Sequence, residues 1–178
     1  MQTSAPKSTL AQLPVWLKRL LLGALVLTLG VALGLWHPEP PPPAPKVVFT
    51  GIDGKSTDLQ ALRGKPVLVT FWATDCHSCV EEIPDLIALY EAYHARGLEI
   101  IAVNMYHDLP SHVVEMTRMK QIPYTVALDV QAQHALAFGR ILATPTTFVI
   151  SPDGLMVKQI IGKFNPEQMR GLLAPYLS

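Results

Sequence analysis

Two apolar segments of strand length flank a stretch with helical periodicity, and this pattern limits the chain to a small set of folds. Val67–Phe71, within KPVLVTFWA, and Leu98–Asn104, within LEIIAVNMY, resemble strands that are buried on both faces of a sheet. Between them, Cys79–Ala95 is expected to be a helix that ends at Gly97, because its apolar residues recur at helical spacing. Such a strand, helix and strand form a right-handed βαβ unit with parallel strands. The chain is therefore predicted to have an α/β fold.

The sequence around this unit predicts further, shorter elements within one domain, which we place at residues 46–178. A small hairpin that turns at Asp53-Gly54 precedes the unit, and an extra strand and helix and then a ββα ending follow it. The later elements are a helix over Ser111–Lys120, a strand in YTVALD, a helix in QHALAFG, strands over Thr146–Ile150 and Leu155–Ile161, and a last helix capped by Asn165.

The N-terminal part of the chain has the composition of a membrane anchor. Leu20–Trp36 contains 17 residues and no charge, and at about 1.5 Å per residue it is at the short end of a membrane span. Val15–Leu17 could lengthen it, so we expect a transmembrane anchor over residues 15–36. A cleaved signal peptide is the alternative, since Ala32-Leu33-Gly34 is an acceptable cleavage site, but the apolar run is long for a signal.

Basic residues predict the orientation of this anchor. The first 36 residues hold Lys7, Lys18 and Arg19 and no acidic residue, and the cytoplasmic ends of membrane spans are rich in lysine and arginine. Residues 1–14 are therefore expected in the cytoplasm, and the body on the periplasmic or extracytoplasmic side of the cytoplasmic (inner) membrane. Residues 37–45, HPEPPPPAP, contain six prolines and are expected to be an extended linker that forms neither helix nor sheet.

The charge of the body excludes one class of partner. Of the 14 basic residues of the chain, 11 follow the first 36 residues, together with all 14 acidic ones. A mildly acidic domain lacks the positive surface that binds phosphate backbones. No nucleic-acid partner is expected.

Cys76 and Cys79 are the only cysteines of the chain, and four kinds of site can be weighed for them. Haem attachment needs a histidine directly after the second cysteine, where Val80 stands. A zinc site needs further ligands at suitable spacing, which the six scattered histidines do not offer. A structural disulfide that closes so short a loop would constrain the unfolded chain little. A variant of the metal site, copper held by the thiols with His107 or Met105, stays open beside the fourth kind of site, a redox-active pair.

The position of the pair favours the redox interpretation. It lies between the end of the first strand of the βαβ unit and the start of its helix, where unpaired backbone N–H groups and the helix dipole stabilise a thiolate. A cysteine there can have its pKa lowered to roughly 3.5–7.5. We expect Cys76, the outer cysteine, to attack a substrate, and Cys79, deeper in the helix, to resolve the mixed disulfide.

The residues around the pair resemble a known family. VLVTFWATDCHSC is similar to the active-site strand and loop of thioredoxin-fold proteins. FWAT-x-C-x-x-C-x-x-E-x-P together with TPTTFVISPDG resembles the TlpA/ResA branch, the membrane-anchored thiol-disulfide oxidoreductases of bacteria. This resemblance covers Val47–Leu177. It implies a thioredoxin-like fold, with a central mixed sheet flanked by helices and an extra strand and helix, preceded by an N-terminal transmembrane helix.

The resemblance assigns roles residue by residue. Cys76 and Cys79 match the attacking and the resolving cysteine of a redox-active disulfide, and Glu82 matches an acidic residue kept beside the thiols. If Glu82 is buried there, its pKa is raised and it can accept the proton of Cys79. Thr144 and Pro145 match a loop whose peptide bond is cis and which faces the disulfide.

Trp72 and His77 join Thr144 and Pro145 as candidate contacts of the substrate. One departure from the family pattern is Asp75, which stands before the first cysteine where a tryptophan is usual. The charge of Asp75 disfavours a neighbouring thiolate, whereas a protonated His77 favours it. The reduction potential therefore does not follow from the sequence.

The resemblance implies an enzyme that exchanges disulfides with protein substrates. Reduction of substrate disulfides, as in cytochrome c maturation or disulfide repair, is the first expectation, with a membrane thiol-disulfide protein as electron donor. Neither a cofactor nor a metal is expected. Oxidation of substrate thiols is the alternative direction, and a non-enzymatic copper-binding or metallochaperone protein is the alternative from another class.

Overall fold

The structure is a computed structural model that describes residues 14–35 and 39–177. The expected cytoplasmic segment 1–14, apart from Pro14, and the residues 36–38 at the junction of anchor and linker lie outside the described residues. The first helix, α1, spans Val15–Leu35. Within the described residues, we find no helix with both the length and the apolar character that a membrane crossing requires.

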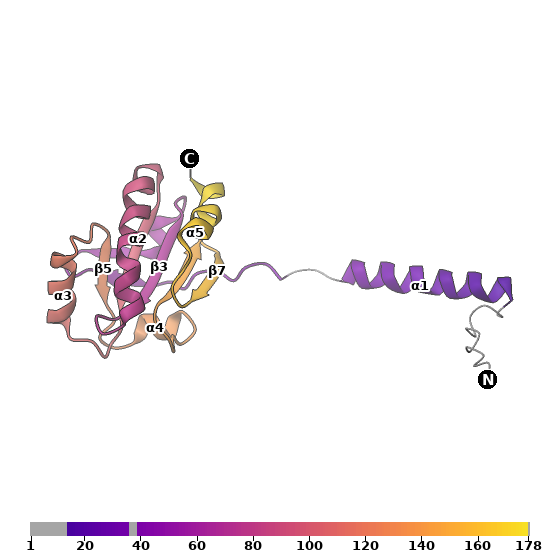
Figure 1. Ribbon diagram of the computed structural model, residues 1–178, viewed down its shortest axis with the longest axis horizontal. Coiled ribbons are helices and arrows are strands. Elements are labelled where there is room, and N and C mark those ends of the chain that lie inside the picture. The colour runs from indigo at the N-terminus through magenta and orange to yellow at the C-terminus, as the bar shows by residue number, and fades with distance from the viewer. Residues whose placement is uncertain (1–13, 36–38, 178) are drawn as a thin grey trace, which may run out of the picture. The chain divides into compact units, whose positions relative to one another are not determined.

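The chain divides into two compact units, Met1–Pro40 and Pro41–Ser178. The second unit contains a five-stranded sheet with the order β5-β4-β3-β6-β7 (Figure 1). β3 is parallel to β4 and β4 to β5, whereas β6 is antiparallel to both β3 and β7. The sheet is therefore mixed, as expected. Its strands are β3 (Val67–Trp72), β4 (Glu99–Asn104), β5 (Thr125–Leu128), β6 (Thr146–Ile150) and β7 (Met156–Ile161).

Helices and an N-terminal hairpin surround this sheet (Figure 1). The predicted βαβ unit is confirmed as β3, α2 and β4, and the element boundaries differ from the expected ones by one or two residues. The α-helices of the compact unit Pro41–Ser178 are α2 (His77–Tyr93), α3 (Pro110–Met119), α4 (Gln133–Ala137) and α5 (Pro166–Leu173). The hairpin is β1 (Val48–Thr50) and β2 (Ser56–Asp58), and the short 3-10 helices are η2 (Leu59–Leu62), η3 (His94–Arg96) and η4 (Ala174–Tyr176).

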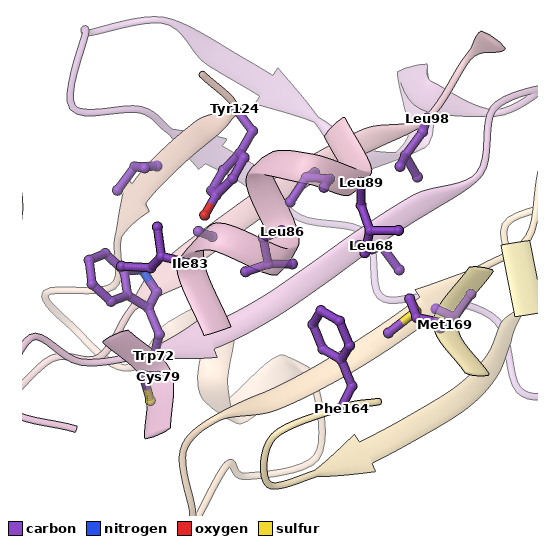
Figure 2. Packing of buried hydrophobic residues seen from close by; sticks show 14 of the residues in the cluster. Leu68, Trp72, Cys79, Ile83, Leu86, Leu89, Leu98, Tyr124, Phe164 and Met169 are labelled. Atoms are coloured by element: carbon purple, nitrogen blue, oxygen red, sulfur yellow. The ribbon is translucent and has the colours of Figure 1, made fainter. Parts of the chain in front are cut away.

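Successive side chains of β3 point to opposite faces of the sheet, and other elements cover both faces. Leu68 and Trp72 enter a core cluster with side chains of α2, α3 and α5 (Figure 2). Val67, Val69 and Phe71 enter a second cluster with side chains of the hairpin and α4. A strand buried on both faces is a rigid base for the chain that leaves its end, and that chain carries the cysteine pair.

The last part of the expected linker lies against the sheet. Pro43 forms an isolated antiparallel bridge with Leu155, just before β7. The Pro42 carbonyl accepts a hydrogen bond of 2.8 Å from the backbone of β7, and the Ala44 N–H donates one of 2.9 Å to the turn before it. The Ala44 side chain is buried.

Of the expected linker, the described residues 39–45 belong to no named helix or strand, but Pro43 adds an isolated bridge beside the sheet that the sequence did not predict. Proline is tolerated at the edge of a sheet where its missing N–H would face outward, and here the neighbours of Pro43 supply the hydrogen bonds. The compact unit accordingly begins at Pro41, whereas the sequence placed the domain start at Lys46.

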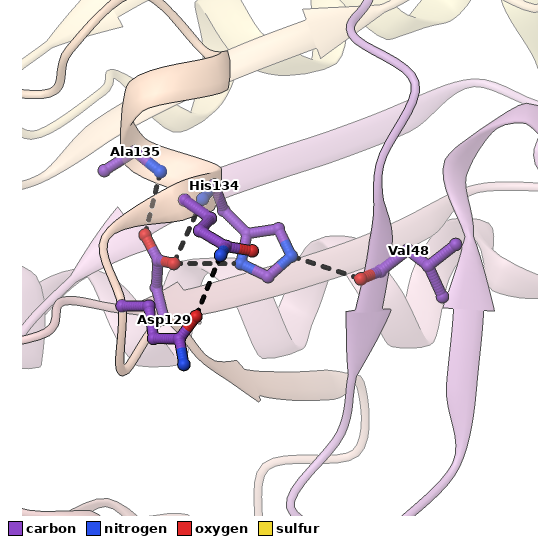
Figure 3. Close-up of polar contacts among 6 residues, drawn as sticks. Val48, Asp129, His134 and Ala135 are labelled. Carbon is purple, nitrogen blue, oxygen red and sulfur yellow. Dashed lines mark hydrogen bonds and ion pairs between the residues drawn. The ribbon is translucent and has the colours of Figure 1, made fainter.

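A buried polar cluster ties the extra strand and helix to the N-terminal hairpin (Figure 3). Asp129, which follows β5, accepts hydrogen bonds from the backbone N–H groups of His134 (3.0 Å) and Ala135 (2.8 Å). The His134 ring joins this carboxylate, at 3.0 Å from Nδ1, to the Val48 carbonyl, at 3.1 Å from Nε2. The same ring stacks on Phe49 with a centroid distance of 4.8 Å. Asp129 thus fixes the start of α4 directly and reaches β1 through the His134 ring.

Candidate active site

The cysteine pair lies at the N-terminus of α2, four residues after the end of β3. Cys76 and Cys79 form a disulfide with their Cα atoms 5.2 Å apart. Cys76 is the N-cap residue of the helix, and its Sγ accepts a hydrogen bond of 3.3 Å from the Cys79 N–H. Because a side chain that accepts from the first turn acts as a cap, α2 begins at His77 and not at Cys79, as the sequence had suggested. Cys79 is buried and Cys76 is half-buried, so the outer sulfur is the accessible one.

Glu82 lies three residues beyond Cys79 on the same helix, and only 1% of its surface is exposed. The backbone N–H of Phe164 donates a hydrogen bond of 2.8 Å to its Oε1. Burial raises the pKa of Glu82 to about 7, although the hydrogen bond from Phe164 opposes this effect. The expected buried carboxyl group with a raised pKa is therefore present, and it can hold or release a proton near neutral pH.

Glu82 and Cys79 line one internal cavity of about 10 Å³. Trp72 and Tyr124 also face it, and Figure 2 shows their side chains beside Ile83 in the core cluster. Within the described residues, Trp72 Nε1 is a buried polar atom without a hydrogen-bond partner. The resolving cysteine and the carboxyl group thus share a small space that the core encloses, where a charge is poorly solvated.

Thr144 and Pro145 lie just before β6, at the end of the sheet where β3 ends and the chain continues to the cysteine pair. Their peptide bond is cis, which confirms that prediction. β6 pairs with β3 so that Thr146 faces Phe71, and the residues before Thr146 continue past the end of β3. Pro145 is buried and its carbonyl accepts a hydrogen bond of 2.8 Å from Gly162, whereas Thr144 is half-buried.

The two other candidate contacts of the substrate have different surroundings. Trp72 is 4% exposed and belongs to the core, so its position favours packing over contact with a substrate. His77 is exposed on the first turn of α2, and its Nε2 lies 3.1 Å from Oε1 of Glu81. Lys163 reaches the other oxygen of Glu81 at 3.6 Å. His77 is therefore part of a small charged surface next to Cys76.

The sequence analysis missed Asp108, which contacts the loop before Cys76. Its carboxylate accepts hydrogen bonds from the backbone N–H and the hydroxyl group of Thr74 and from the side chain of Asn104. Asp108 and Thr74 are 34 residues apart, so no local pattern links them. The one available signal is that the carboxyl ends of the parallel strands β3 and β4 meet at the same edge of the sheet.

The described residues contain no group of three or more histidine, cysteine, aspartate and glutamate side chains arranged to hold a metal ion. The two sulfur atoms that a copper site with His107 or Met105 would use are joined to each other in the disulfide.

A disulfide at the start of the helix that follows the central strand of a mixed sheet, with a cis-proline at the same edge, defines a thiol-disulfide oxidoreductase with a thioredoxin-like fold. The chain belongs to the Redoxin family, whose model matches residues 42–173. It is 35% identical over 130 residues to the thiol-disulfide oxidoreductase ResA of Bacillus thuringiensis strain Al Hakam. This match covers 73% of the chain and 74% of that protein. The chain is thus a ResA-like enzyme of the thioredoxin type.

Solved structures show the same fold. A thiol:disulfide interchange protein of the thioredoxin family from Chlorobium tepidum TLS is 26% identical, with a TM-score of 0.72 over 80% of this chain and 100% of that one. A thioredoxin-like protein from Neisseria meningitidis is also 26% identical, with a TM-score of 0.70 over 75% of this chain and 88% of that one. The comparison structures thus share the fold of the unit that carries the site.

Proposed function

We propose that the enzyme works as a reductase of protein disulfides outside the cytoplasm, for example in cytochrome c maturation or disulfide repair. The observation that carries the disulfide exchange is the arrangement of Cys76, Cys79 and Glu82 on α2, whereas the reducing direction and the location rest on the resemblance to the TlpA/ResA branch and on the N-terminal sequence. The Cys76 sulfur caps the helix, and the Cys79 sulfur, one turn further along the helix, is buried. The carboxyl group of Glu82 lines the same cavity as Cys79.

The first step is the attack of the reduced Cys76 on a substrate disulfide. The thiolate of Cys76 forms a bond to one substrate sulfur, and the other substrate sulfur leaves as a thiolate that takes a proton from water. The helix N-terminus favours the attacking thiolate, because unpaired N–H groups and the helix dipole point at the capping sulfur. The Cys79 N–H that meets Cys76 Sγ in the oxidised protein is one of these groups.

The second step is resolution by Cys79. Its thiol transfers the proton to Glu82, and the resulting thiolate attacks Cys76 Sγ and displaces the second substrate thiolate. The two enzyme thiols have then lost two electrons, the substrate has gained them, and the Cys76–Cys79 disulfide has formed. Glu82 suits this role because its pKa of about 7 lets it accept a proton and return it near neutral pH.

The location of the enzyme is part of the proposal. Leu20–Trp36 would anchor the chain in the cytoplasmic membrane, with Lys18 and Arg19 on the cytoplasmic side, and a membrane thiol-disulfide protein would reduce the enzyme again. Since no described helix meets the requirements for a membrane crossing, this part rests on the sequence alone. A reporter that is active only after export, fused after Pro45, should be active; an expressed but inactive fusion would contradict the proposed topology.

The reduction potential of the Cys76–Cys79 pair tests the direction of the reaction. The full chain is equilibrated in detergent with glutathione and dithiothreitol buffers, and the fraction of the disulfide is measured. A potential near or below that of thioredoxin, about −270 mV, supports a reductase, whereas a value near about −120 mV identifies an oxidant of substrate thiols.

A further inference from the structure

Asp108 holds the turn that leads into the cysteine pair. Its Oδ2 accepts a hydrogen bond of 2.6 Å from the Thr74 N–H, and its Oδ1 accepts one of 2.7 Å from the Thr74 hydroxyl group. The Asn104 side chain donates a third bond of 2.8 Å to Oδ2. In each of these bonds the partner donates, and an ionised carboxylate accepts all of them through two oxygens, whereas an amide has only one accepting oxygen.

The surroundings of Asp108 keep this group ionised and fixed. Burial would raise the pKa of Asp108, but the hydrogen bonds from Asn104 and Thr74 outweigh it and lower that pKa. Asn104 is the last residue of β4, and the next residue, Met105, donates its N–H to the Trp72 carbonyl at 2.9 Å. Asp108 is therefore tied to the end of the two central parallel strands.

Thr74 is the second residue of a tight turn that ends at Cys76. The Cys76 N–H closes this turn by donating a hydrogen bond of 3.3 Å to the Ala73 carbonyl. Cys76 leaves the turn in an extended conformation, φ −88° and ψ 105°, which places its sulfur over the first turn of α2. A thiolate is stabilised there only while the sulfur stays aligned with the N–H groups of that turn.

We propose that Asp108 is a positioning residue for the attacking sulfur: by clamping Thr74 at two points, it holds Cys76 in the capping position in which the helix stabilises its thiolate. The clamp matters most in the reduced enzyme, because the disulfide no longer fixes Cys76 to the helix. This inference rests on the proposal that Cys76 is the attacking cysteine.

Positioning and simple charge predict opposite effects on Cys76. A negative charge near a thiolate disfavours it, so removal of the Asp108 charge would by itself lower the pKa of Cys76 and speed its reaction. Loss of the clamp moves the sulfur away from the helix N-terminus, which raises that pKa and slows the reaction. The sign of the change therefore separates the two roles.

The experiment compares reduced full-length chains in detergent. Asp108→Asn removes the charge and leaves one accepting oxygen for donors that now share two, and Thr74→Val removes the hydroxyl group but leaves the charge of Asp108. The rate of alkylation by iodoacetamide is measured against pH for each cysteine separately, by mass spectrometry, together with the rate constant for reaction with oxidised glutathione. Thr74→Ser keeps the hydroxyl group, and Glu115→Gln removes an exposed acid of α3 as a control for charge.

At pH values below the pKa of Cys76, we expect Asp108→Asn and Thr74→Val each to slow its alkylation about tenfold. This is the change in thiolate fraction that a rise of one pKa unit produces. The double variant should be hardly slower than Asp108→Asn, because both changes open one clamp. Thr74→Ser should restore most of the rate, and Glu115→Gln should equal the wild type. A faster Cys76 in Asp108→Asn with an unchanged Thr74→Val would overturn the proposal. Faster alkylation of Cys79 than of Cys76 in the wild type would instead reject the assignment of the attacking cysteine.

Discussion

At the scale of single residues, the side chains along the first two turns of α2 have different environments. Cys76 caps α2 and is half-buried, whereas Glu82 is enclosed by the core and has a raised pKa. Cys79 lies between them and is buried. The helix thus presents a reactive group at its end and a proton acceptor inside, and two predictions test this difference.

The first prediction concerns the pH dependence of stability. Because the folded-state pKa of Glu82, about 7, is above its ordinary value of 4.5, the folded protein binds this proton more tightly than the unfolded chain. The free energy of unfolding should therefore fall as pH rises from about 4.5 to about 7, by on the order of 2–3 kcal/mol from this group. Urea unfolding of the oxidised chain between pH 4.5 and 8 measures it.

Glu82→Gln should lack this fall, because it has no carboxyl group to ionise. Glu81→Gln is the matched control, since Glu81 is the exposed neighbour on the same helix. If the stability of Glu82→Gln changes with pH in parallel with that of the wild type, the carboxyl group of Glu82 is not the one that titrates.

The second prediction concerns the order of the two cysteines. Cys79→Ser should accumulate mixed disulfides with substrate proteins, because Cys76 still attacks but no thiol resolves the product. Cys76→Ser should not, since Cys79 is buried. Electrophoresis without reductant, after alkylation of free thiols, shows the trapped species, and the opposite pattern would reverse the assignment.

At the scale of elements, a buried carboxylate helps to hold the extra strand and helix to the hairpin, beside the bridge between Gly51 and Ala127. Asp129 accepts hydrogen bonds from two backbone N–H groups at the start of α4 and contacts the ring of His134 (Figure 3). Buried groups whose partner is removed are costly. Asp129 is therefore expected to stabilise the joint between β5, α4 and β1.

The third prediction is that Asp129→Asn lowers the free energy of unfolding by about 1–3 kcal/mol, because the variant replaces a charged acceptor by an amide whose NH2 group faces N–H donors. The reaction of the reduced chain with oxidised glutathione should stay within about twofold of the wild type when the variant is folded. Urea unfolding checks the stability, and Asp153→Asn, at an exposed turn, is the control. An unchanged stability in Asp129→Asn would show that the cluster does not hold the elements together.

At the scale of the whole molecule, the proline-rich segment is both a connection and a part of the domain. Pro42 and Ala44 pair with the chain at the start of β7, and Ala44 is buried. The compact unit therefore includes residues 41–45, although four of these five residues are prolines.

The fourth prediction compares two shortened chains. A chain that begins at Pro41 should fold with a higher free energy of unfolding than one that begins at Lys46, by about 1–3 kcal/mol, because the shorter chain loses two hydrogen bonds of about 0.5–1.5 kcal/mol each at the sheet edge. Urea unfolding of the two chains at one pH measures the difference. Equal stabilities would mean that the bridge at Pro43 contributes nothing.

The sequence by itself determined the features that depend on neighbouring residues. The apolar runs around Val67 and Leu98 and the helical spacing between them predicted the βαβ unit, and the spacing of Cys76 and Cys79 at a helix start predicted the redox pair. These patterns are local, because strand and helix periodicities show within ten to twenty residues. The resemblance to the TlpA/ResA branch added the cis bond before Pro145 and the burial of Glu82.

Only the tertiary structure decided the contacts between distant segments. Phe164 meets Glu82 across 82 residues, and Asp108 meets Thr74 across 34. A hydrogen bond between such residues leaves no periodicity in the sequence, since it depends on which strand ends share an edge and how the loops leave them. The bridge at Pro43 escaped prediction for the same reason: a proline has no N–H to pair, and only the position of β7 beside it supplies partners for its neighbours.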